Sequence, residues 1–84
     1  MARVQIYSTG WCAACTRAKA LLDAHGIDHE EILLDDEPDF RRRLFELTGG
    51  WTVPQIVIDD DPIGGYTELW QLDRSGRLEQ RLAA

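Results

Sequence analysis

The 84-residue sequence has little of several residue types: two cysteines, two histidines, three prolines, and only nine basic residues against fifteen acidic ones. The resulting net charge of −6 argues against a nucleic-acid partner, because phosphate binding requires a basic face. No basic N-terminal segment leads into an apolar stretch, and no apolar run approaches the length that spans a bilayer. We therefore expect a cytoplasmic protein that binds neither nucleic acid nor membrane.

The chain also lacks repeats, low-complexity segments and a recognisable linker, which predicts one domain over residues 1–84. A chain of this length is near the lower limit at which a hydrophobic core stabilises a fold by itself. Its 44 % hydrophobic content is adequate for such a core. A disulfide between the two cysteines would close a very short loop and would add little stability through chain entropy.

The two cysteines, Cys12 and Cys15, lie in a Cys-x-x-Cys spacing inside the stretch YSTGWCAACTRAKALL. Alternating apolar residues just before it predict a strand that ends near Tyr7. Apolar residues at helical spacing from Ala14 to Leu22 predict a helix that opens on Cys12, and Gly26 is placed to end it. A strand, a tight turn and a helix that begins at the first cysteine are typical of a redox-active thiol pair.

The position of this pair predicts different roles for the two thiols. The first turn of a helix has unpaired N–H groups and the positive end of the helix dipole, which stabilise a thiolate. Cys12 is therefore the expected nucleophile, and Cys15 is the thiol that resolves a mixed disulfide. Two other interpretations stay open here: a pair of core cysteines, or half of a zinc site. A zinc site needs four ligands, and the remaining candidates, His25 and His29, follow the far end of the helix.

Further strands and helices follow in alternation. Residues 29–34 are expected to form a second strand parallel to the first, because a helix separates the two. The later expected elements are a β-branched strand over 55–58, an aspartate-rich turn over 59–62, a return strand from Ile63, a helix over 66–72 and a last helical turn over 78–82.

Between the second and third strands, residues 35–48 predict a helix with an acidic start. Acidic residues and a proline over 35–39 are typical of a helix N-terminus. Phe40, Leu44 and Leu47 would form its buried stripe. Residues 41–43 are three arginines, the only basic cluster of the chain, and a solvated helix face is the simplest explanation for them.

Three motifs at matching distances give the chain a resemblance to the glutaredoxins, in particular the short bacterial dithiol class. They are Cys12-Ala13-Ala14-Cys15, Thr52-Val53-Pro54 and Gly64-Gly65-Tyr66-Thr67-Glu68. The resemblance covers essentially the whole chain. It implies an α/β thioredoxin-like fold, with a four-stranded mixed sheet flanked by three to four helices in the order β-α-β-α-β-β-α. It also implies a cis Val53-Pro54 peptide bond.

The resemblance further implies a glutathione site beside the cysteines. Thr52 and Val53 would hold the cysteinyl part of glutathione through backbone bonds, and the cis Pro54 would turn the Val53 backbone outward for this pairing. Gly65, Tyr66, Thr67 and Glu68 would hold its γ-glutamyl end, where a helix N-terminus meets the carboxylate and an acidic side chain meets the ammonium. Arg41 stands where the family often keeps a residue for the glycyl carboxylate, so for this arginine the binding role and the solvated face both stay open.

The chain departs from the family pattern at several positions around the cysteines. Ala13-Ala14 replaces the usual Pro-Tyr pair, and Thr9 stands where the family usually keeps a lysine. Trp11, directly before Cys12, is more typical of thioredoxins and mycoredoxins. Trp51 replaces a smaller or basic residue, and it would be either a half-buried packing residue or a wall of the substrate groove.

The expected function is glutathione-dependent thiol–disulfide oxidoreduction, with disulfide-bearing or glutathionylated proteins as partners, glutathione as co-substrate, and a monomeric enzyme without a metal or tightly bound cofactor. One alternative keeps the chemistry but takes electrons from thioredoxin reductase. Another is a protein that binds an iron–sulfur cluster between two subunits with glutathione as a ligand, since Ala13-Ala14 would leave room for it.

Overall fold

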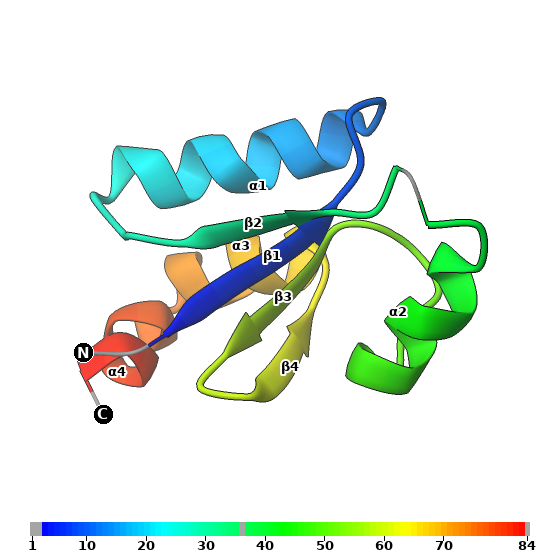
Figure 1. Cartoon of the computed structure of the whole chain (residues 1–84). Helices are drawn as coiled ribbons and strands as arrows, with labels where there is room; N and C mark the ends of the chain where they lie inside the picture. Colours follow the sequence, from blue (N-terminus) through cyan, green and yellow to red (C-terminus); the bar gives the residue numbers. More distant parts are fainter. Residues whose placement is uncertain (1–2, 36, 84) are drawn as a thin grey trace.

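The computed structural model describes residues 3–35 and 37–83, so Asp36 of the expected acidic cap lies outside the described residues. Within them the chain forms four strands and four helices (Figure 1). Their order is β1 (Val4–Ser8), α1 (Ala13–Ala24), β2 (Glu30–Leu33), α2 (Phe40–Thr48), β3 (Gln55–Ile58), β4 (Asp61–Gly64), α3 (Tyr66–Arg74) and α4 (Arg77–Ala83).

The four strands form one mixed sheet in the order β2-β1-β3-β4. β1 pairs in parallel with β2, with Ile6 opposite Glu31, and antiparallel with β3, with Ile6 opposite Ile56. β3 and β4 form an antiparallel hairpin. The parallel first pair follows from the helix between them, because α1 must carry the chain back along the sheet. This is the mixed sheet that the resemblance implies.

The main hydrophobic core lies between the sheet and helices α1, α3 and α4. Alternate residues of β1 and β3 face it, because successive side chains of a strand point to opposite faces. Its buried members are Val4, Ile6, Ala18, Leu22, Ile56, Ile58, Leu69 and Leu78. Helix α2 packs separately, against β3 and β4.

Helix α2 corrects one part of the sequence prediction. Leu44 is buried as expected, but Leu47 is 45 % exposed. The covered positions of this helix are Phe40, Leu44 and Thr48, which repeat at a spacing of four residues, and Leu47 lies beside that stripe. The helix also begins at Phe40, so the proline expected in its first turn lies in the preceding turn instead.

The hairpin between β3 and β4 is tighter than expected. Asp59 and Asp60 alone form the turn, both with positive φ (50° and 66°), a conformation that aspartate tolerates better than most residues. β4 therefore begins at Asp61, two residues before the expected strand. At the other end of the chain, Arg81 pairs with Asp61 at 2.8 Å and ties α4 to this strand.

The topology gathers the three motifs at one end of the sheet. In Figure 1 the end of β1, the start of α1, the loop before β3 and the start of α3 all lie at the right-hand end. The start of β1 and helix α4 lie at the opposite end. None of the helices in the described part of the chain is long and apolar enough to cross a membrane.

Candidate active site

Cys12 is the N-cap residue of α1. Its backbone is extended (φ −103°, ψ 112°), and its Sγ atom accepts the backbone N–H of Cys15 at 3.1 Å. A sulfur in this position takes up one of the unpaired donors of the first helical turn, and a thiolate would gain more from that bond than a neutral thiol. The side chain is partly exposed. Cys12 is thus both reachable and supplied with a donor.

Cys15 is in the opposite situation, because the body of the helix and the sheet bury it completely. Burial is the main cause that raises the pKa of its thiol to about 12, and the hydrogen bond with Cys12 adds to it. A backbone bond with Thr9 and the positive charge of Lys19 oppose the shift without reversing it. The two thiols therefore differ in access, since Cys12 is partly exposed and Cys15 is enclosed and held protonated.

The loop before β3 lies directly against Cys12. The Cys12 thiol donates to the carbonyl oxygen of Val53 at 3.6 Å. The Val53-Pro54 peptide bond is cis, as the resemblance implies. The Gln55 side chain donates to the Thr52 carbonyl at 2.9 Å and so holds the loop from inside. Val53 is thus brought to Cys12 from 41 residues away in the sequence.

The start of α3 adjoins the same loop. A Cβ atom at Gly65 would lie 3.2 Å from the Pro54 carbonyl oxygen, so this close approach favours glycine. Glu68 turns back and accepts the Gly65 N–H at 2.8 Å, which caps the helix from its own first turn. One carboxylate oxygen of Glu68 is therefore occupied by the backbone. Tyr66 is half-buried and Thr67 exposed on this helix start.

Arg41 reaches the loop from α2. Its Nη1 atom donates to the Trp51 carbonyl at 2.9 Å, and its guanidinium lies 5.0 Å from the centroid of the Phe40 ring. The side chain is exposed, and the remaining N–H groups of the guanidinium stay available for an anion. Arg42 instead faces Asp39 and Glu46 at 3.6 and 3.9 Å. The first arginine of the cluster is therefore the one directed toward the loop.

Several contacts around the cysteines were not found by sequence reasoning. The Asp35 carboxylate accepts the Gly10 N–H at 2.9 Å and anchors the turn that presents Cys12. Lys19, one turn after Cys15, pairs with Glu31 at 2.6 Å. The four-residue spacing of Cys15 and Lys19 was a usable signal that Lys19 lies near the Cys15 thiol, but it did not indicate the pairing of Lys19 with Glu31. No sequence signal indicated the contact of Asp35, because its partner Gly10 lies 25 residues away.

Thr9 is a further departure from expectation. The residue that stands in place of the family's lysine is only 2 % exposed, and its hydroxyl has no hydrogen-bond partner within the described chain. A lysine here would have to extend past buried neighbours to reach water. Thr9 is thus part of the packing under the cysteines and not an exposed surface position.

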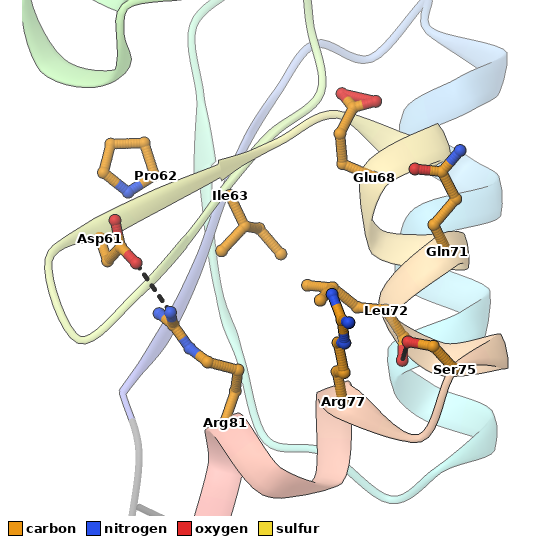
Figure 2. A pocket seen from close by; sticks show the side chains of 9 residues that line it. All are labelled: Asp61, Pro62, Ile63, Glu68, Gln71, Leu72, Ser75, Arg77 and Arg81. Carbon is orange, nitrogen blue, oxygen red and sulfur yellow. Dashed lines mark hydrogen bonds and ion pairs between the residues drawn. The ribbon is translucent and has the colours of Figure 1, made fainter.

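Other hollows of the surface lie away from the thiols. One of about 510 Å³ lies between β4, α3 and α4 (Figure 2), and neither cysteine lines it. Glu68 at its rim is its one residue in common with the expected glutathione site. Across residues 3–35 and 37–83, no three His, Cys, Asp or Glu side chains are grouped to hold a metal ion.

Comparison with known proteins identifies the family. The glutaredoxin family model matches residues 4–63. The chain is 44 % identical to a glutaredoxin of Pseudomonas aeruginosa over the full length of both proteins. It is 42 % identical to glutaredoxin 3 of Escherichia coli, with 98 % of this chain and 99 % of that protein covered.

Solved structures give the same result for the fold. A buckwheat glutaredoxin–glutathione complex superposes with a TM-score of 0.87 at 32 % identity, covering 98 % of this chain and 77 % of that one. A glutaredoxin from Brucella melitensis superposes at 0.81 with 37 % identity, covering 93 % and 85 %. The expected thioredoxin-like fold is thereby confirmed. The chain belongs to the glutaredoxin family, as a dithiol glutaredoxin with a Cys12–Cys15 pair and hence a glutathione-dependent thiol–disulfide oxidoreductase.

Proposed function

We propose that Cys12 is the nucleophile of this oxidoreductase and Cys15 its resolving thiol, acting on protein disulfides and glutathionylated thiols. The observation that carries the proposal is the N-cap position of Cys12, with its sulfur partly exposed and 3.1 Å from the Cys15 N–H. The Cys12 thiolate attacks a substrate disulfide, forms a mixed disulfide and releases one substrate thiolate. Cys15 then displaces the second substrate sulfur and closes the Cys12–Cys15 disulfide.

Two glutathione molecules return the enzyme to its reduced form. The first thiolate opens the Cys12–Cys15 disulfide and binds to Cys12, and the second displaces it as glutathione disulfide. On a glutathionylated substrate Cys12 takes the glutathionyl group directly, and one further glutathione releases it. That route needs only one cysteine.

Glutathione would lie across the start of α3 and the loop before β3. The family relative from buckwheat was solved as a complex with glutathione, which supports the same ligand here. The backbone of Thr52 and Val53, beside the cis Pro54, would pair with the cysteinyl part, since an available stretch of backbone recognises an extended peptide by hydrogen bonds.

The two ends of glutathione would meet opposite charges. At the γ-glutamyl end, the first-turn N–H groups of Tyr66 and Thr67 beside Gly65 suit the carboxylate, and the second oxygen of Glu68 suits the ammonium. At the glycyl end, Arg41 has free N–H groups directed past Trp51. Each contact uses an atom that the fold leaves available beside Cys12.

Glutathione as the electron donor is tested by a turnover assay on the pure protein. The enzyme is given a disulfide substrate and either glutathione with glutathione reductase or thioredoxin reductase alone, both with NADPH. We expect turnover with glutathione only. Equal turnover with thioredoxin reductase alone would reject glutathione as the specific donor.

A further inference from the structure

Four aromatic side chains form two ring pairs that involve the residue before Cys12, helix α2 and the loop before β3. Trp11 and Phe40 meet edge to face, with ring centroids 6.3 Å apart and planes at 72°. Phe45 and Trp51 stack, with centroids 4.5 Å apart and planes at 22°. The rings come from the turn before α1, from α2 and from the loop before β3, so only the tertiary fold brings them together. We call these four residues the aromatic surface.

Arg41 joins the two ring pairs. Its guanidinium lies over Phe40, and its Nη1 atom holds the backbone of Trp51. Phe40, Arg41 and Trp51 line one shallow hollow of about 380 Å³. One ring of each pair therefore borders the same concavity, together with the Arg41 side chain.

This surface is costly to leave in water. Trp11 is 67 % exposed, Trp51 54 % and Phe45 44 %. Exposed apolar side chains that are scattered singly over a protein surface are ordinary. A group of neighbouring exposed apolar side chains instead marks an interaction site. Tryptophan and arginine are also the residue types that most often anchor binding.

The location of the aromatic surface indicates its occupant. Trp11 directly precedes Cys12, and Trp51 lies two residues before Val53, whose carbonyl contacts the Cys12 sulfur. A polypeptide whose disulfide reaches Cys12 must therefore pass beside these rings. We propose that the aromatic surface docks polypeptide substrates and selects those with apolar side chains next to the reactive cysteine. The proposal rests on the function given above, since it specifies which disulfides the same Cys12 receives.

The proposal adds no new chemistry to the reaction. Cys12 attacks one sulfur of the peptide disulfide and releases the other as a thiolate that takes up a proton. While the peptide is bonded to Cys12, its flanking side chains lie on the aromatic surface. Cys15 then displaces the peptide, and two glutathione molecules reduce the Cys12–Cys15 disulfide. One peptide disulfide and two glutathiones thus give one peptide dithiol and one glutathione disulfide.

The kinetic test compares two disulfide peptides of equal length and charge. One has leucine and phenylalanine beside its cysteines, and the other has serine. For the unaltered enzyme we expect kcat/KM to favour the apolar peptide by about tenfold, the discrimination that one small apolar contact supplies. The Trp11→Ala/Trp51→Ala variant should lose most of that ratio. Trp70→Ala removes an exposed tryptophan of α3 that instead stacks with Arg74, and it should keep the ratio.

A second test measures docking without turnover. The three indole N–H signals of the protein are assigned by NMR with single Trp→Phe variants, and a serine-for-cysteine version of the apolar peptide is added. Shifts at Trp11 and Trp51 with none at Trp70 support the proposal. Shifts at all three signals or at none overturn it. The proposal is also overturned if sedimentation shows that the protein self-associates and this self-association shifts the Trp11 and Trp51 signals, since the occupant is then a second copy.

The outcomes separate this inference from the proposed function. Reduction of both peptides at the same rate, with the ratio unaffected by the Trp11 and Trp51 substitutions, overturns the docking surface and leaves the oxidoreductase intact. Failure to reduce either peptide with glutathione overturns the proposed function itself.

Discussion

The Sγ atom of Cys12 accepts the backbone N–H of Cys15 at 3.1 Å, so the helix that buries one cysteine donates a hydrogen bond to the other. The two thiol side chains are also hydrogen-bonded to each other. Cys12 remains partly exposed at the helix start, whereas Cys15 is enclosed one turn further on. The roles proposed for the two thiols rest on this relationship.

We predict unequal effects of replacing the two cysteines. Cys12→Ser should abolish all thiol transfer, because only this sulfur is both reachable and supplied with a helix N–H. Cys15→Ser should retain removal of glutathione from a glutathionylated peptide, which needs one nucleophile, and lose most reduction of a peptide disulfide. Both reactions are followed by coupled oxidation of NADPH. Equal losses in the two variants on the glutathionylated peptide would contradict the assignment.

The pKa of Cys15 predicts a dependence of stability on high pH. The thiol has a pKa of about 12 in the fold, mainly because of burial, against an ordinary value of 9.0. Between these values the folded protein holds a proton that the unfolded chain has lost, so this contribution to stability is complete below pH 9 and is lost as the pH rises toward 12. Urea unfolding from pH 8 to 10.5 should show a steeper decline for the parent than for Cys15→Ala. Parallel curves would disprove the link.

Arg41 and Arg42 form a matched pair for testing anion recognition. Arg41→Ala should raise the Michaelis constant for glutathione by about two- to fivefold at low salt, because exposed charge pairs contribute roughly 0.2–1 kcal/mol. Arg42→Ala removes the same charge from a side chain held by Asp39 and Glu46, and it should change the constant little. The Arg41 effect should fade as ionic strength rises. An equal effect of both variants would point to net charge alone.

Glu68 is expected to have two roles that different substitutions separate. Glu68→Gln keeps an oxygen that can accept the Gly65 N–H but removes the charge, so stability should hold while the Michaelis constant for glutathione rises. Glu68→Ala also removes the cap and should cost about 0.5–1.5 kcal/mol in unfolding free energy. Urea titrations and steady-state kinetics on both variants give the two readouts. Unchanged kinetics in Glu68→Gln would remove the carboxylate from the binding site.

Thr9→Val should stabilise the protein. The valine has nearly the same shape and removes a buried hydroxyl that has no partner in residues 3–35 and 37–83. The expected gain is about 1 kcal/mol, since a buried unpaired polar group typically costs about 1–3 kcal/mol. Thermal and urea unfolding measure it, with Thr16→Val as an exposed control. A loss of stability would mean that the Thr9 hydroxyl has a partner in solution.

Much of the site was predictable because it depends on local structure. The helix that opens on Cys12 follows from a short strand, a turn and a run of apolar residues at helical spacing, all within about one βα unit. The end of α2 at Gly49, which has a φ of 79°, is equally local, because few residues other than glycine adopt that backbone conformation. For such features the neighbouring sequence contains the physical cause.

Only the tertiary structure decided which of these local features meet. Cys12 contacts Val53, and Gly65 approaches Pro54. Arg41 donates a hydrogen bond to the Trp51 carbonyl. The spacing of these residues in the sequence does not predict that they meet. The exposure of Leu47 and the burial of Thr9 depend in the same way on what packs above each residue. Hydrophobic periodicity predicts one face of an isolated helix or strand, but the covered area depends on neighbours from distant parts of the chain. The thiol chemistry can therefore be predicted from the sequence, whereas the surface that receives the substrate forms only in the tertiary structure.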